Sequence, residues 1–361
     1  MAQETDPNPP PHADTQLNAA KARRSLRNGL ISLVLLLALV VGVLLAIPGL
    51  QGVAHEVSRM QLSWILVAIA CEILSCLGYV VAFLQVFDRA PLRLGARVAL
   101  SELAFGAAVS LGGAGSLAVG AWLLVERGAR PARVAERSAV LFFYTSAINV
   151  ITLAAAGLGL FLGLPGPSNP LLSMVPAGVG VAVLVFFALL PRTGDRLAAG
   201  RRPGKLRTFL TEAAFTVREC ERLLRTPDWR LLGCIGYLWF DIAVLMACFA
   251  AIGRVPPLAP VVLAYQIGYL SNFIPIPGGI GVLDGSMVGM LVLYGVSGTA
   301  ATAATLVYHA IALWIPATWG TIAFLVLQRT RGQPVTLRAP REERRRQKRK
   351  RREAERRKST T

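Results

Sequence analysis

Residues 272–285 read NFIPIPGGIGVLDG and interrupt an apolar region that runs from Val261 to Tyr294. Proline lacks the backbone N–H that a helix interior needs, and glycine adopts conformations that other residues avoid. The helix-breaking residues of the block are Pro275, Pro277, Gly278, Gly279, Gly281 and Gly285. We therefore expect two short helices that enter the membrane and leave it on the same side, which is a re-entrant hairpin.

A second apolar region, from Val98 to Val125, has the same character. Its middle reads LGGAG at residues 111–115, and a tight reversal can form at Gly112, Gly113 and Gly115. Basic residues flank this region on both sides: Arg89, Arg93, Arg97, Arg127, Arg130, Arg133 and Arg137. Because such residues concentrate in cytoplasmic segments, both ends of this hairpin are expected there. Alternatively, each glycine cluster only allows neighbouring helices to pack closely.

The two regions are spaced as an internal repeat. Gly112 and Gly278 are 166 residues apart, and the apolar spans before them begin 169 apart, at residues 62 and 231. Each unit, about 62–163 and 231–327, reads as span, hairpin, span. The second hairpin has only Arg254 before it and no charged residue between Gly295 and Leu327, so its ends are expected outside. Units of opposite orientation form an inverted repeat, which is a recurrent transporter design.

The other apolar runs are long enough to cross a membrane, which takes about 20 residues. Hydrophobic residues make up 54% of the chain and charged residues 16%, against about 25% charged in soluble domains. Full spans are expected near 29–47, 62–87, 139–162, 171–190, 231–252 and 300–327. The sequence thus predicts an all-α polytopic membrane protein with about six full transmembrane helices and two glycine-broken re-entrant hairpins.

Polar and basic segments surround this transmembrane domain, which covers residues 28–328. Residues 1–27 predict a disordered basic cytoplasmic arm, and residues 329–361 a basic cytoplasmic tail attracted to anionic lipid. The cytoplasmic loop 191–230 contains residues 209–224, which form either an amphipathic helix on the inner leaflet or a plain connector. We expect a bacterial inner-membrane protein with both termini in the cytoplasm. The basic residues that give the net charge of +18 lie in segments that flank apolar runs, so no nucleic-acid partner is expected.

Ionisable side chains within apolar regions are candidates for function, because inserting a charged one costs about 2.5 to 3.5 kcal/mol. Glu72 and Asp241 are 169 residues apart, at matching positions of the two units. We expect a symmetric pair that lines one cavity; independent, buried, protonated carboxyls are the alternative. Asp284 follows the second glycine turn and either caps a half helix or binds a cationic headgroup or a proton. Glu102 and His309 complete the set.

Sequence motifs for cofactor or metal chemistry are absent. There is no Walker loop, no serine nucleophile elbow and no acidic metal motif. The five cysteines and three separated histidines give neither a disulfide framework nor a metal-ligand spacing. We expect no cofactor, no metal and no enzyme activity.

The stretch 272–285 resembles the signature of the lysylphosphatidylglycerol synthase transmembrane-region family. The likeness continues through residues 293–296 and Tyr308. This family includes the flippase domain of multiple-peptide-resistance proteins and stand-alone membrane proteins. The chain departs from the family pattern at three positions: it has Asp284 where Glu is common, His309 where Arg is common, and Leu111 where Pro is common.

The resemblance implies a stand-alone lipid translocator without the synthase domain. Its substrate would be an anionic phospholipid or a lipid-linked headgroup. The candidate binding residues are Asp284, His309, Tyr308, Glu102, Glu72, Asp241 and Asn272. One alternative is a non-catalytic partner of a lipid- or envelope-synthesis enzyme. The other is a membrane transferase that uses Asp284, Glu102 or Asp241 as a general base.

Overall fold

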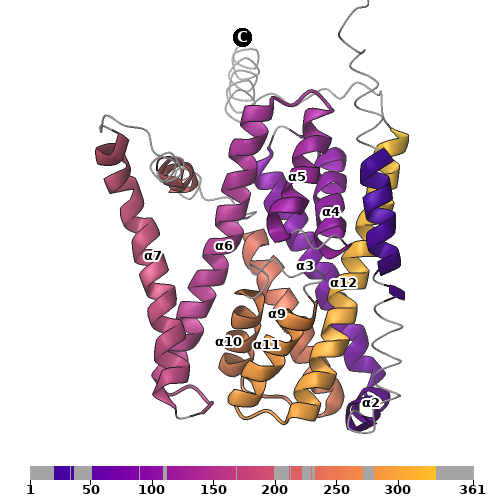
Figure 1. Cartoon of the computed structure of the whole chain (residues 1–361), viewed down its shortest axis with the longest axis vertical. Helices are drawn as coiled ribbons and strands as arrows, with labels where there is room; N and C mark the ends of the chain where they lie inside the picture. The colour runs from indigo at the N-terminus through magenta and orange to yellow at the C-terminus, as the bar shows by residue number, and fades with distance from the viewer. Residues whose placement is uncertain are drawn as a thin grey trace, which may run out of the picture.

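The computed structural model describes residues 20–32, 34–35, 51–88, 90–108, 112–167, 169–198, 211, 213–221, 229, 232–270 and 280–330. These residues form helices and the turns between them, without a strand (Figure 1). Five helices are long and apolar enough to cross a membrane: Leu62–Val86, Pro131–Phe161, Pro170–Pro191, Leu232–Ile252 and Gly298–Arg329. The all-α membrane fold is therefore confirmed. The span predicted near 29–47 lies partly outside the described residues.

Two sets of four helices follow the same order: long, short, short, long. The first set is α3 (Leu62–Val86), α4 (Leu92–Ala108), α5 (Gly112–Val125) and α6 (Pro131–Phe161). The second set is α9 (Leu232–Ile252), α10 (Leu258–Leu270), α11 (Ile280–Leu293) and α12 (Gly298–Arg329). The short helices have 13 to 17 residues. At 1.5 Å per residue they cannot span about 30 Å of hydrocarbon.

The two pairs of short helices lie at opposite ends of the molecule. Helices α4 and α5 are at the upper end in Figure 1, and α10 and α11 are at the lower end. Helices α6 and α12 extend along the full height and run in opposite directions (Figure 1). Between the two ends, α3 and α9 make the most extensive contact of any two described helices.

Two long helices extend beyond the apolar runs that predicted them. Helix α6 begins at Pro131 rather than near residue 139, with proline in the first turn, where its missing N–H is not needed. Helix α7 (Pro170–Ala198) continues past Pro191. Hydropathy marks only the part of a helix that lies in hydrocarbon, so the polar ends of both helices escaped the prediction.

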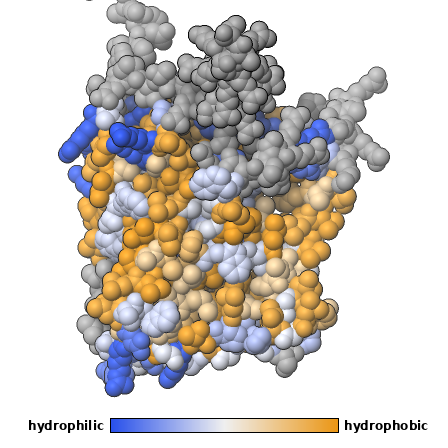
Figure 2. Space-filling view, turned by 180° about the vertical axis from the view of Figure 1, so that it is seen from behind, coloured by the Kyte–Doolittle hydropathy of each residue, from blue (hydrophilic) through white to orange (hydrophobic). Residues whose placement is uncertain are grey.

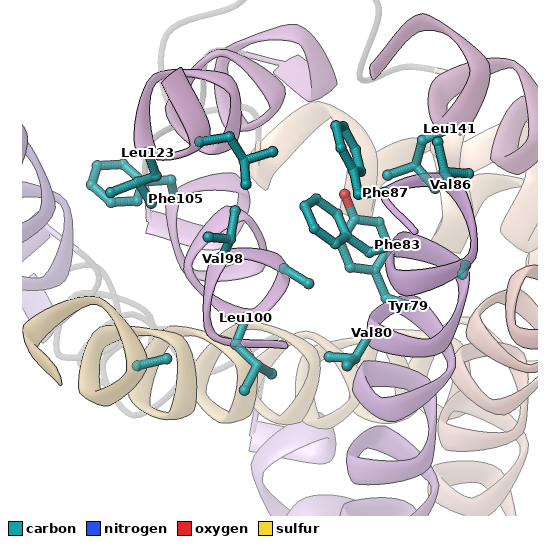
Figure 3. Close-up of a cluster of buried hydrophobic side chains, with 14 of the residues drawn as sticks. Tyr79, Val80, Phe83, Val86, Phe87, Val98, Leu100, Phe105, Leu123 and Leu141 are labelled. Atoms are coloured by element: carbon teal, nitrogen blue, oxygen red, sulfur yellow. The ribbon is translucent and has the colours of Figure 1, made fainter. Parts of the chain in front are cut away.

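The upper half of the molecule is held together by a core between α3, α4, α5 and α12. Phe83 and Phe87 stack with ring centroids 4.4 Å apart, and Phe105 meets Phe324 edge-on at 5.3 Å. Figure 3 shows Tyr79 among the apolar side chains of this core. A hydroxyl in such surroundings needs a hydrogen-bond partner.

The outer surface is apolar over its middle and hydrophilic at its ends, as one face shows in Figure 2. Helix α7 exposes many large apolar side chains: Leu171 is 69% exposed and Val175 is 55% exposed. Patches of this kind are unfavourable in water but suit contact with lipid tails.

A helix between α7 and α9 is present over residues 213–221, within the segment where an amphipathic helix was one of two predictions. Its apolar residues Ala214 and Val217 pack with Leu190 of α7. The hydroxyl of Tyr144 in α6 donates a hydrogen bond of 2.8 Å to the carbonyl of Cys220. This loop helix is therefore docked on α6 and α7.

Candidate functional site

The closest approach of α3 and α9 is made by two glycines. A Cβ atom on Gly78 would lie 2.6 Å from the backbone nitrogen of Tyr237, and one on Gly233 would lie 2.6 Å from the Gly78 carbonyl oxygen. Real side chains do not approach backbone atoms that closely, so only glycine fits at this crossing. Ser75 adds a hydrogen bond of 2.8 Å from its hydroxyl to the Tyr237 carbonyl.

Glu72 and Asp241 meet beside this crossing, one from α3 and one from α9. Their carboxyl groups interact electrostatically and lie within hydrogen-bonding reach of each other. Glu72 is 4% exposed, whereas Asp241 is half-buried. The structure thus brings the two carboxyl groups together, and the cavity that they are expected to line stays a prediction.

Hydroxyl and thiol groups surround this pair. Tyr265 of α10 and Tyr308 of α12 both donate hydrogen bonds to Oδ2 of Asp241, the second over 3.2 Å. On the other side, the Cys76 thiol donates to Oε1 of Glu72 over 3.6 Å, from one turn further along α3. The pair therefore receives hydrogen bonds from side chains of three helices, α3, α10 and α12. These bonds hold both carboxyl groups in place.

His309 lies at the edge of the same cluster. Its ring meets that of Tyr308 at a centroid distance of 5.8 Å, and it interacts electrostatically with Asp241. Like Asp241, His309 is half-buried. The structure thus brings together four of the predicted residues: Glu72, Asp241, Tyr308 and His309.

Glu102 occupies a separate site in the upper half. It is 1% exposed, and its Oε2 accepts a hydrogen bond of 2.7 Å from the Tyr79 hydroxyl. Its Oε1 lies against Gly120 of α5, where an added Cβ atom would be 1.6 Å away. Tyr79 and Tyr237 have ring centroids 5.2 Å apart. A pair of aromatic rings therefore lies between Glu102 and the acidic pair.

Several predicted residues lie at or beyond the limits of the described structure. Gly112, Gly113 and Gly115 begin α5, and Gly281 and Gly285 belong to α11. Asn272 and the turn residues Pro275, Pro277, Gly278 and Gly279 fall outside the described residues. Asp284 is the fifth residue of α11. An N-terminal cap directly precedes the first residue of a helix, so the alternative that Asp284 caps this helix does not fit.

Three tyrosines of the site were not predicted from the sequence. Tyr79, Tyr237 and Tyr265 lie within apolar runs, where a tyrosine reads as a packing residue. The signal that could have found them is the hydroxyl itself, because a buried phenol needs a polar partner within reach. In the described residues no group of three or more Asp, Glu, His and Cys side chains is arranged to hold a metal ion.

The apolar surface, the five spanning helices and the short helices at both ends define a multi-pass α-helical membrane protein. The sequence profile of the family described as lysylphosphatidylglycerol synthase TM region matches residues 29–320. The chain belongs to this family, as its proline and glycine block predicted.

One relative shares part of this sequence. A UPF0104 membrane protein of Methanothermobacter thermautotrophicus (strain Delta H) is 32% identical over 90 residues. The match covers 25% of this chain and 26% of the relative, so the chain matches about a quarter of that protein's length.

Proposed function

We propose that this protein is a lipid translocator of the flippase type, which moves a phospholipid or lipid-linked headgroup between the leaflets of the membrane. The observation that carries the proposal is the acidic pair Glu72 and Asp241, with its tyrosine donors, inside an otherwise apolar bundle. Polar groups at such a depth cost free energy and are retained where a polar substrate or ion must pass. Family membership supports a role with membrane lipids.

The two four-helix sets are interpreted as an inverted repeat. Corresponding helices occur in the same order, while the short pairs lie at opposite ends and α6 and α12 run in opposite directions (Figure 1). In transporters built this way, the binding site lies near the midplane, where the repeats meet. The α3 and α9 crossing, which holds the acidic pair, is the corresponding place in this chain.

The orientation in the membrane follows from the charges at the two ends. At the end of α5 and α12, Arg127 donates hydrogen bonds to the carbonyls of Leu123 and Leu327. Arg137, near the start of α6, and Arg329, the last residue of α12, lie toward this same end of the molecule, because the two helices run in opposite directions (Figure 1). We assign this basic end to the cytoplasm of a bacterial inner membrane, with both termini on that side.

Translocation would carry the headgroup past the half-buried Asp241 and His309 while the acyl tails stay in the bilayer. The proposed substrate class is an anionic phospholipid or a lipid-linked headgroup, because the His309 ring and the tyrosine hydroxyls can donate hydrogen bonds to it. We propose transport without chemical conversion.

The experiment is leaflet exchange of headgroup-labelled phospholipids in proteoliposomes. Wild-type protein should make inner-leaflet label accessible to an added quencher, and His309→Ala together with Tyr308→Phe should slow this at least about tenfold. His55→Ala, in the last turn of α2 (Gln51–Ser58) and away from the cluster, is the matched control and should exchange lipid at the wild-type rate. Failure of the wild-type protein to move any lipid class would refute the translocator.

A further inference from the structure

Glu72 and Asp241 approach each other closely enough for a hydrogen bond between their carboxyl groups. A carboxylate has acceptor oxygens only, so two carboxylates cannot form that bond unless one of them carries a proton. Two like charges held side by side in an apolar interior would repel each other strongly. The contact therefore requires at least one proton on the two side chains.

Each carboxyl group also keeps an oxygen that no hydrogen-bond donor among the described residues reaches. These atoms are Oε2 of Glu72 and Oδ1 of Asp241, and both are buried. Because Glu72 is 4% exposed, bulk water does not satisfy its oxygen. An acceptor left without a donor in such a place is destabilising, and a proton held by the pair supplies the missing donor.

We propose that Glu72 and Asp241 form a proton-binding site that is loaded and unloaded once in each transport cycle. The inference rests on the proposed function and supplies its source of energy. In the loaded state the pair shares one proton and carries a single negative charge. On unloading, the proton passes to water on the other side of the membrane and leaves two carboxylates. No bond to carbon forms or breaks.

The position of the pair couples its charge to the arrangement of the two repeats. Glu72 belongs to the first helix set and Asp241 to the second, so loss of the proton places two negative charges on opposite sides of the interface between them. Tyr265 and Tyr308, both of the second set, hold Asp241 in its own unit. Repulsion then acts between the repeats, and it favours a second arrangement in which α3 and α9 are further apart.

The other titratable groups around the pair do not compete for this role. Those that interact with it from α3, α9, α10 and α12 are Cys71, Cys76, Tyr237, Tyr265, Tyr269, Tyr308 and His309. None of them is a third carboxyl group.

The first test is lipid movement in proteoliposomes under imposed ion gradients, with the full chain and a fluorescent phospholipid. A difference of about one pH unit should drive net movement, with a lipid asymmetry of up to about tenfold for one proton per lipid. A sodium gradient at constant pH should have no effect. Movement that ignores the pH gradient, or that follows sodium, would overturn the proton site and leave the translocator standing; movement under no condition would overturn the translocator itself.

Variants of the pair separate coupling from transport. Glu72→Gln and Asp241→Asn each keep the size of the side chain and remove the exchangeable proton, so the response to the pH gradient should be lost. Glu72→Asp keeps a carboxyl and should retain a response. The control is Glu56→Gln at the surface end of α2, where Glu56 pairs with Arg254 over 3.7 Å; its response should equal that of wild type.

The second test detects the proton without transport. Infrared difference spectra of the purified protein between acid and neutral pH should contain the carbonyl band of a protonated carboxyl group. This band should shift or disappear in both Glu72→Gln and Asp241→Asn and persist in Glu56→Gln. A spectrum that is identical in wild type and both pair variants, recorded on protein with unchanged gel-filtration profiles, would overturn the inference.

Discussion

Tyr79 of α3 donates a hydrogen bond of 2.7 Å to Oε2 of Glu102 in α4, at a place where Glu102 is 1% exposed. This bond joins the first two helices of the first set through their polar side chains. Tyr79→Phe removes only the hydroxyl and leaves the Glu102 oxygen without its donor. We expect the free energy of unfolding to fall by about 0.6 to 1.7 kcal/mol, the range for hydrogen bonds between membrane helices.

The measurement is denaturant unfolding in detergent micelles, extended to a double-mutant cycle with Glu102→Leu. If the two residues interact as described, the double variant should lose less stability than the sum of the single variants. Strict additivity of the two effects would show that this hydrogen bond contributes nothing.

Gly120 of α5 allows the Glu102 carboxyl group to fit. In Gly120→Ala the new methyl group would overlap the carboxyl group of Glu102, so this buried side chain must shift and its hydrogen bond with Tyr79 is strained. We expect a loss of about 1 to 3 kcal/mol, the usual cost of overpacking a core. The matched control is Gly289→Ala in α11, where no atom lies within 4 Å; it should be neutral or stabilise its helix by up to about 1 kcal/mol. Equal stability of the two variants would contradict this packing.

The crossing of α3 and α9 makes a similar demand on Gly78. Gly78→Ala would place a methyl group 2.6 Å from the Tyr237 backbone nitrogen, so the two helices must separate and the acidic pair beside the crossing must loosen. We expect lower stability, by about 1 to 3 kcal/mol, together with slower lipid exchange. Gly178→Ala on the lipid-facing α7 has open space and should change neither. If the Gly78→Ala protein is less stable but exchanges lipid at the wild-type rate, close packing of α3 and α9 is not needed for transport.

The repeat spacing predicted more of this molecule than hydropathy did. Five apolar runs were enough to identify the spanning helices, but the match between Glu72 and Asp241 at an offset of 169 residues indicated that two distant carboxyls would meet. Their donors were not predictable in the same way, because Tyr265 and Tyr308 both lie in the second unit, and the residues 169 positions earlier are Ala96 and Ala139. The repeat spacing therefore pointed to the carboxyls but not to the tyrosines that donate to them.

Helix ends were harder to predict because different forces determine them. Hydropathy reports the thickness of the hydrocarbon, whereas α6 begins at Pro131 for reasons of backbone geometry. The loop helix illustrates a second limit. Its composition allowed a helix on the inner leaflet, and its contacts with Leu190 and Tyr144 come from tertiary packing, which local composition does not contain.

The basic segment 331–361 offers a test between a transport core and a docking protein. These residues lie outside the described structure and beyond α12, the last helix of the second set. We expect a chain truncated after Thr330 to exchange lipid in proteoliposomes within about twofold of the wild-type rate, because salt-screened attraction to anionic lipid does not form the site. A truncated chain that moves lipid in vitro and yet fails to complement a deletion strain would favour a role in docking an envelope-synthesis enzyme.

The docked loop helix should protect Cys220 from thiol reagents. Burial, aided by the neighbouring Glu219 carboxylate, raises the pKa of Cys220 to about 12, so the neutral thiol persists until the pH nears that value. At pH 8 only on the order of one Cys220 in ten thousand is ionised, against about a quarter for an ordinary cysteine. Arg137→Ala removes the 3.5 Å ion pair with Glu219 and should speed maleimide labelling at least about tenfold in a chain whose other cysteines are alanine. Arg133 is exposed and lies on α6 like Arg137, so labelling should stay slow in the control Arg133→Ala. Rapid labelling of Cys220 in a chain that keeps Arg137 would mean that the loop helix is not docked.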